Sequence, residues 1–308
     1  MHTQLFLLLQ AEADSGLQLS DVLLELIGFL AYFATFGALG FRLVVLRRDA
    51  GFDSNMAGSG NAFAAARRGA ATVGIIGALL LLVSIFANAM AQSAARGTPF
   101  GTVLTAHGGR MLIPLVAAFA ILIGFALGRD ALAGWVLAVI GALVLVFQGF
   151  ATSLKWPSLI NPVHRASASL WLGTLLVLVT VGLPVVFRAG ATAEERGRMT
   201  AALVSRFSPL ALCAAGLLAI TGVITAWRHL HRLSSLWTTP YGYTLDIKLV
   251  FVIIILSLGA WNWKRMTPRL GTEAAAGELR RSATAELVFA GVVLVLTAIL
   301  VSLPSPRA

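Results

Sequence analysis

Long apolar runs separated by short polar segments make up most of the chain from about residue 19 onward. A helix needs roughly 20 apolar residues to cross a hydrocarbon layer of about 30 Å. Eight runs reach that length, so we predict an all-α, polytopic membrane helix bundle with eight transmembrane helices. They lie near residues 19–46, 69–91, 108–128, 131–150, 164–187, 207–227, 244–263 and 284–303.

The composition supports a membrane protein and excludes other classes. Of the 308 residues, 58% are hydrophobic and 12% are charged, which is more apolar surface than one soluble core needs. The net charge of +10 does not indicate a nucleic-acid partner, because the basic residues lie between apolar runs instead of clustering on a water-exposed face. Membrane lipids are the expected surroundings. The single cysteine, Cys213, excludes a disulfide framework and a paired-cysteine metal site.

Lysine and arginine are unevenly distributed among the loops. Most of them follow the first, third, fifth and seventh apolar runs, and basic loops stay on the cytoplasmic side. The segment 1–16 contains Glu12 and Asp14 but no basic residue, so it lacks the charged start of a secretory signal and forms a short polar lead-in. We therefore predict that both termini lie outside, in an N-out/C-out arrangement.

A short internal repeat relates the two halves of the chain. The segment Thr98–Leu104 resembles Thr239–Leu245 at an offset of 141 residues, and both precede a helix that runs from outside to inside. The match indicates a possible parallel 4+4 repeat, with a four-helix half at 1–150 and a second at 151–308. Such repeats place a substrate path between the halves.

Histidine and methionine gather on the predicted outer side. His107 opens the third predicted helix, next to Met111, and Met90 ends the second. Imidazole and thioether ligands together suit copper. The alternative is that histidines simply favour the water-facing ends of helices. All five histidines fall on this side: His2, His107, His164, His229 and His231.

Individual histidines differ in what their positions predict. His164 and Trp171 are seven residues apart, which places them on one helix face that points into the bundle. His164 is either a metal ligand or a histidine hydrogen-bonded to a neighbouring helix. His229 and His231 diverge on a helix, so we expect them to be solvent-exposed and not ligands.

Charged residues inside the predicted helices need partners, because an unpaired charge at membrane depth costs several kcal/mol. We expect Lys248 to form a structural ion pair with Asp21, Glu25 or Asp246. Lys248 is also the counterpart of His107 in the repeat.

Glu286 lies near the inner end of the last predicted helix. Arg206, Arg265 or Asn262 can meet it there, which predicts a structural clamp, with a proton relay as the alternative.

Two sets of residues in this chain resemble the signatures of a known family. The segment from His164 to Leu175, with Trp171 and Gly173, resembles a signature of the copper resistance protein D (CopD) family. The resemblance is good over residues 161–304 and looser before them. A second signature is spread over Arg206-Phe207-Ser208-Pro209-Leu210-Ala211, Thr221-Gly222, Thr239-Pro240-Tyr241-Gly242, Leu245, Lys248, Asn262, Pro268, Glu286 and Pro304.

The resemblance implies a multi-pass copper-handling protein of the bacterial inner membrane. It implies copper transport or copper resistance, with copper entering from the periplasmic side and possible delivery by a periplasmic CopC-type carrier. His164, His107, Met90 and Met111 are the candidate copper ligands. The candidate path or structural residues are Trp171, Tyr241, Lys248, Glu286 and Asn262.

One departure from the family affects the ligand set. Many relatives carry a histidine where this sequence has Phe150, between Gly149 and Ala151. Phenylalanine cannot bind a metal. Either Met90, Met111 or His107 replaces that ligand, or this chain has lost or changed its metal.

Two alternatives to copper transport remain open. His107 and His164 begin separate predicted helices at similar depth and could be the axial ligands of one b-type haem, which would make the chain a membrane redox protein. A metal-free structural membrane subunit is the second alternative. We do not expect an enzyme, because the sequence offers no nucleophile, base pair or phosphate-binding loop.

Overall fold

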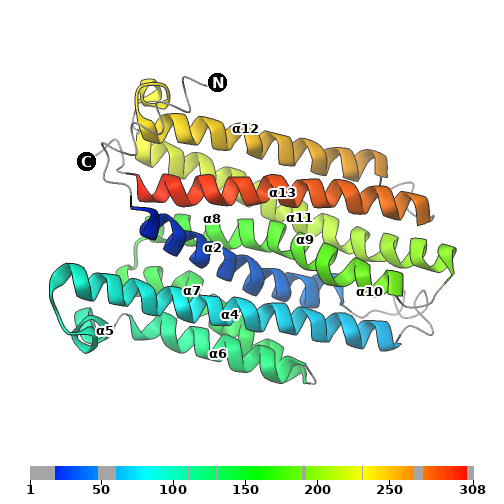
Figure 1. Cartoon of the computed structure of the whole chain (residues 1–308), viewed down its shortest axis with the longest axis horizontal. Helices are drawn as coiled ribbons and strands as arrows, with labels where there is room; N and C mark the ends of the chain where they lie inside the picture. The colour runs from blue at the N-terminus through cyan, green and yellow to red at the C-terminus, as the bar shows by residue number, and fades with distance from the viewer. Residues whose placement is uncertain are drawn as a thin grey trace.

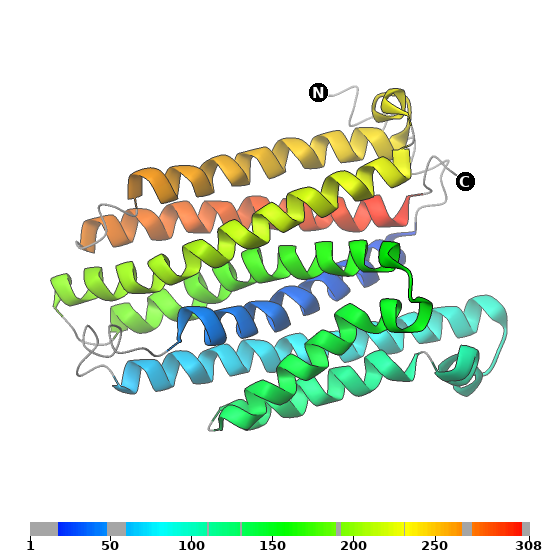
Figure 2. The same cartoon turned by 180° about the vertical axis from the view of Figure 1, so that it is seen from behind.

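The computed structural model is a bundle of long, roughly aligned helices (Figures 1 and 2). It describes residues 18–47, 60–109, 111–129, 131–188, 192–230, 232–266 and 273–303, and these contain helices and loops but no strand. The segment 1–16, read above as a polar lead-in, and the histidines His2 and His231 lie outside the described residues.

The helices follow one another with short connections. In the first part they are α2 (Leu19–Gly40) with the π-helix η1 (Phe41–Val45), α4 (Gly60–Arg96), α5 (Phe100–Gly109), α6 (Leu112–Gly128) and α7 (Leu132–Ser153). One long helical stretch then changes type several times: η2 (Trp156–Leu159), α8 (Ile160–Ala168), η3 (Ser169–Gly173), α9 (Thr174–Val177), η4 (Leu178–Gly182) and α10 (Leu183–Arg188). The last part comprises α11 (Ala193–Leu230), η5 (Leu233–Leu236), α12 (Pro240–Trp261), η6 (Asn262–Met266) and α13 (Glu273–Ser302).

The prediction of an all-helical, multi-pass membrane protein is confirmed. Seven helical stretches among the described residues are long and apolar enough to cross a membrane, and α6 is a shorter apolar helix of 17 residues. Two helices extend well beyond their apolar runs: α4 has 37 residues and α11 has 38. Their extensions are rich in alanine, which favours helix whether or not the segment is buried in lipid.

We predicted that His107 opens the third membrane helix, and the structure shows that it does not. It lies in the separate short helix α5, which begins after Pro99 and ends at Gly109. The apolar α6 begins only at Leu112. Gly108 and Gly109 are poor helix formers, so the helix ends there although the apolar run continues.

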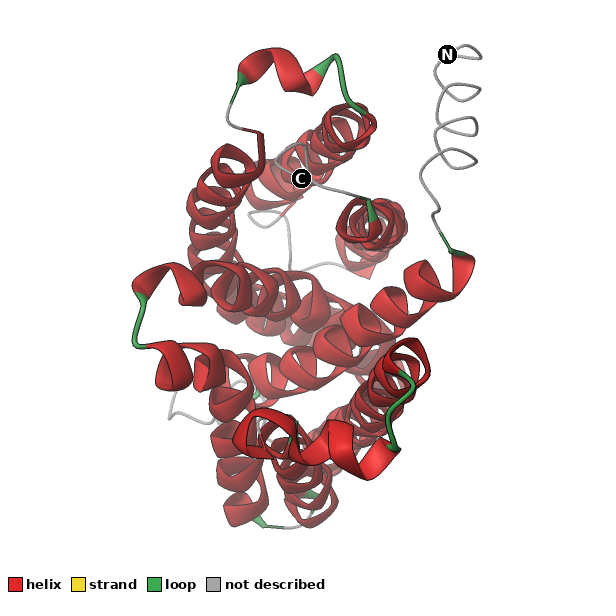
Figure 3. Cartoon of the chain, turned by 90° about the vertical axis from the view of Figure 1, so that its left-hand side faces the viewer, coloured by secondary structure: helices red, strands yellow, loops and turns green. Residues whose placement is uncertain are grey.

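Helix α2 occupies the middle of the bundle. It packs against α4 on one side and against η3, α9 and α13 on another. Helices α6 and α7 pair beside α4, α12 pairs with α13, and α11 packs against α8. Figure 3 looks along the bundle from the end at which α2, α8 and α12 begin, which we call the His164 end; the opposite end is the Glu286 end.

Glycines allow the closest helix contacts. A Cβ on Gly37 would collide with the backbone of Gly173, and one on Gly173 would collide with the carbonyl of Phe33 in α2. Small residues of this kind let membrane helices approach backbone to backbone, which replaces the missing hydrophobic driving force with close van der Waals contact. The crossing of α2 and η3 therefore has no room for a side chain.

We expect Gly173→Ala to destabilise the protein by about 1–3 kcal/mol, because the new methyl group must push the α2 backbone away. Gly216→Ala in α11 is the matched control, since a Cβ there meets no atom within 4 Å. It should be neutral or slightly stabilising, by up to about 1 kcal/mol. Thermal unfolding of the detergent-purified protein measures both; an equal loss in the two variants would contradict the tight crossing.

Candidate functional site

His164 lies in the second turn of α8 and faces α11. Its Nδ1 is 3.0 Å from the hydroxyl oxygen of Thr221. The next residue of α11 is Gly222, where a Cβ would come within 3.2 Å of the imidazole Cε1. A bare glycine and a threonine hydroxyl together form the surface against which the ring packs.

The protons of this contact can be assigned by counting donors. The Thr221 hydroxyl lies 2.7 Å from the carbonyl oxygen of Leu217, which can only accept, so its single hydrogen is donated there. The hydroxyl oxygen is then available as an acceptor, which favours the neutral tautomer with its proton on Nδ1; the ring also has a hydrogen bond with the Leu218 backbone. In that tautomer the lone pair is on Nε2. Metal-binding histidines commonly have this arrangement, in which a hydrogen bond at one nitrogen orients the other.

Lys248 of α12 is the charged neighbour of this histidine. It is close enough to act electrostatically on the imidazole. We predicted an ion pair of Lys248 with Asp21, Glu25 or Asp246. No ion pair involving Lys248 occurs among the described residues. The half-buried lysine lies instead near the imidazole of His164, which is also half-buried.

Trp171 is 6% exposed and sits in η3, where the helix widens from α to π. Single π-helical turns inside membrane and soluble helices are frequent near functional sites. The seven-residue spacing predicted one regular face for His164 and Trp171. That prediction assumed an uninterrupted α-helix, but the π-helix η3 interrupts the α-helix between the two residues.

The other candidate ligands are not brought together with His164 in the described part of the chain. Met90 is 58% exposed on α4. Met111 lines a cavity that does not include His164. The His107 side chain lies outside the described atoms. No group of three His, Cys, Asp or Glu residues that could hold a metal occurs among the described residues.

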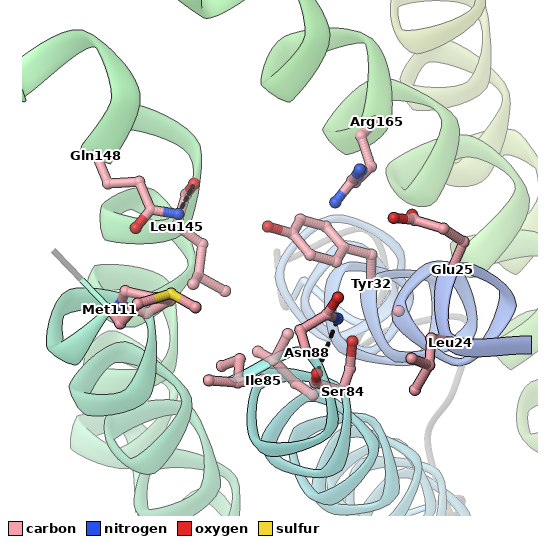
Figure 4. Close-up of a pocket in the computed structure, with 13 residues that line it drawn as sticks. Leu24, Glu25, Tyr32, Ser84, Ile85, Asn88, Met111, Leu145, Gln148 and Arg165 are labelled. Carbon is pink, nitrogen blue, oxygen red and sulfur yellow. Dashed lines mark hydrogen bonds between the residues drawn. The ribbon is translucent and has the colours of Figure 1, made fainter. Parts of the chain in front are cut away.

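The cavity near Met111 lies on another side of α8, between it and α2, α4, α6 and α7 (Figure 4). Its volume is about 190 Å³. The guanidinium of Arg165, the residue after His164, stacks over Phe29 at 5.0 Å and Tyr32 at 5.1 Å from the ring centroids. Sequence reasoning missed this cavity, although an arginine directly after a candidate ligand was a signal. Polar or sulfur-containing lining residues are Glu25, Tyr32, Ser84, Asn88, Met111, Gln148 and Arg165.

His229 is a second histidine that the structure orders, whereas we expected it to be exposed. Its ring is half-buried and stacks on Tyr241 with centroids 5.8 Å apart and planes 11° apart. Its Nδ1 lies 2.8 Å from the carbonyl oxygen of Thr225, which can only accept. The Nδ1 therefore carries a proton here as well. The stack on Tyr241 could not be predicted, because it joins α11 to α12.

The Glu286 end of the bundle contains the clamp that the sequence predicted. Asn262 donates a hydrogen bond from Nδ2 to Oε1 of Glu286. Both side chains are buried, with exposed fractions of 7% and 4%. Of the three partners considered for Glu286, Asn262 meets it, and the Arg265 side chain lies outside the described atoms. The π-helix η6 begins at this asparagine.

Phe150, where the resemblance led us to expect a histidine, packs against Trp156. Its ring centroid lies 5.3 Å from that of Trp156. The side chain thus closes the turn between α7 and α8. At position 150 the structure has an aromatic contact where the resemblance led us to expect a metal ligand.

The seven long apolar helical stretches of the described residues define an integral membrane protein. Within that class, residues 201–300 match the family model described as Copper resistance protein D. The match confirms the resemblance to the CopD family over residues 201–300, which include most of the second signature, and it does not extend to the segment from His164 to Leu175.

A curated relative points the same way. The "Copper transport protein CutJ" of Bacillus subtilis (strain 168) is 31% identical over 169 residues, which are 53% of this chain and 29% of that protein. The match spans less than a third of the relative's length. No solved structure matches the chain. Both matches relate this chain to copper-associated membrane proteins.

We expect Asn262→Ala to lower the stability by about 1–3 kcal/mol, because it leaves the Glu286 carboxyl buried without its donor. Asn262→Gln keeps an amide and tests whether the length of the side chain matters. Asn88→Ala is the control, because the amide of Asn88 donates to the Ser84 carbonyl of its own helix. Thermal unfolding in detergent measures all three. A loss for Asn88→Ala as large as for Asn262→Ala would show that the clamp has no special weight.

Proposed function

We propose that this protein handles copper in the bacterial inner membrane, in transport or resistance, and that His164 is the first protein ligand for copper arriving from the periplasmic side. The observation that carries the proposal is the proton assignment at His164. The Thr221 hydroxyl holds the protonated Nδ1, so Nε2 keeps its lone pair without any change of tautomer. The CopD-family domain supports copper as the metal.

The proposed topology has eight membrane spans, which are the seven long apolar stretches and the shorter helix α6. Both termini lie on the periplasmic side. The His164 end of the bundle is then the outer end, and the basic loops lie in the cytoplasm. We further propose that 1–150 and 151–308 are the two halves of a parallel repeat. Copper passes between them; the two halves contact each other through α2 and the stretch from α8 to α10, and the path lies beside the closed crossing of Gly37 and Gly173.

The remaining candidates have distinct proposed roles. Met111, Met90 and His107 supply further ligands as copper moves, since thioether and imidazole both suit copper. Trp171, Tyr241 and Lys248 shape the path near the His164 end. Glu286 and Asn262 stabilise the Glu286 end. A periplasmic CopC-type carrier is the proposed donor, and the protein acts as a carrier and not as an enzyme.

Removing the imidazole tests the proposal directly. We expect His164→Ala to lower copper affinity at least tenfold, measured by competition with a chelator on the purified protein, and to abolish the copper-dependent growth phenotype of cells. His229→Ala is the matched histidine control and should change both much less. Copper binding and growth that are unchanged in His164→Ala would refute the proposed ligand.

The role of the hydroxyl is tested separately. Removal of an outer partner of a metal-bound histidine typically costs about 10–100-fold in metal affinity. We expect Thr221→Val to fall in that range and Thr221→Ser, which keeps the hydroxyl, to stay near the parent value. If valine and serine give the same affinity, the hydroxyl does not orient the ring.

The haem alternative makes a different spectroscopic prediction. A b-type haem held by His107 and His164 gives a Soret band that disappears in His164→Ala. We expect the purified protein, expressed with haem available, to show no Soret band. A band that His164→Ala removes would replace copper transport by the redox function.

A further inference from the structure

The cavity beside Arg165 shares only Met111 with the copper proposal, and it concentrates polar groups near the His164 end of the bundle. Of its 13 lining residues, six carry charged, hydroxyl or amide side chains. Polar groups inside a membrane protein are expensive and mark a functional site by default. Its volume of about 190 Å³ exceeds the ~30 Å³ share of one water molecule and is below the ~300–1,000 Å³ of pockets for drug-sized ligands. The occupant must be small.

The charges of the lining define its chemistry. Arg165 is the only cation and Glu25 the only carboxylate among the lining residues, so their formal charges cancel. The two form no ion pair with each other, although both are described. A bare metal cation is repelled by Arg165, and a simple anion by Glu25. A ligand that carries one charge of each sign satisfies both.

Arg165 is prepared to bind a carboxylate. Its guanidinium lies over the ring faces of Phe29 and Tyr32, which stabilise the charge by cation–π contact and hold the group in place. Arg165 also hydrogen-bonds the Tyr32 side chain, and a guanidinium has five N–H donors, so further donors remain for a ligand. A guanidinium edge pairs with a carboxylate through two parallel hydrogen bonds.

The position of the two charges limits how far apart the ligand's charges can be. In Figure 4, Arg165, Tyr32 and Glu25 lie on one side of the cavity, and Met111 and Gln148 lie on the other. The two charged groups of the ligand must therefore be neighbours. The far side is partly apolar, through Leu145 and Met111, and suits a short side chain.

We propose that this cavity binds a compact zwitterion of the α-amino acid type. Its carboxylate pairs with Arg165 and its ammonium group with Glu25. The amide of Asn88, which donates to a carbonyl of its own helix, presents its oxygen as a further acceptor. Neither Arg165 nor Glu25 is a proposed copper ligand, so the proposal is tested separately from the copper function.

The test uses the full-length purified protein in detergent and three probes of nearly equal size. L-Alanine carries both charges, N-acetyl-L-alanine only the carboxylate, and L-alanine amide only the ammonium group. Isothermal titration at constant ionic strength should show alanine binding at least tenfold more tightly than either analogue. Equal binding of alanine and N-acetyl-alanine, or no binding of alanine at millimolar concentration, overturns the proposal.

Variants assign the two contacts. Arg165→Gln should weaken alanine binding at least tenfold, and Arg165→Lys should restore only part of it, because lysine has no planar fork. Glu25→Gln should remove the preference for alanine over N-acetyl-alanine. Asp21→Asn, one turn earlier on α2, and Arg96→Gln, exposed at the end of α4, are matched controls that do not line the cavity.

Each variant is checked by size-exclusion elution and thermal unfolding. If Arg165→Gln does not fold, Glu25→Gln and the charge-deleted probes on the parent protein still decide the question. Alanine binding that all the cavity variants retain overturns the assignment. Copper affinity of the parent protein is measured in parallel, so that a failure here is distinguishable from a failure of the copper proposal.

Discussion

The contact between Gly37 of α2 and Gly173 of η3 is the constraint on which the rest of the arrangement depends. The two backbones meet where no Cβ fits, so this crossing fixes the depth and rotation of the helix that carries His164. Because α2 also packs on α4 and α13, the same contact positions both sides of the bundle. Gly173 is therefore needed for helix packing.

The fixed rotation of α8 separates two chemistries on consecutive residues. His164 faces α11 and is oriented by Thr221, whereas Arg165 faces α2 and stacks on Phe29 and Tyr32. Neighbouring residues of a helix point about 100° apart, so a histidine and an arginine can serve unrelated sites.

Local sequence patterns were reliable where a single helix or a single pair was involved. The apolar runs predicted the membrane helices, and the depth of Glu286 on its helix predicted three possible partners, of which Asn262 meets it. The position of His107 was wrong because two glycines end α5 before the apolar α6 begins. The ion pair expected for Lys248 is absent among the described residues, because depth along the membrane says nothing about rotation around a helix axis.

The sequence by itself determined that this is a helical membrane protein with a CopD-like C-terminal part, since both depend on hydrophobic length and on motifs read along one chain. Only the tertiary structure decided which groups meet. The Thr221 hydroxyl beside His164, the stack of His229 on Tyr241, and the cavity that unites Glu25 with Arg165 each join helices far apart in sequence. Those meetings depend on the angle at which each helix is rotated, and glycine contacts between backbones set that angle.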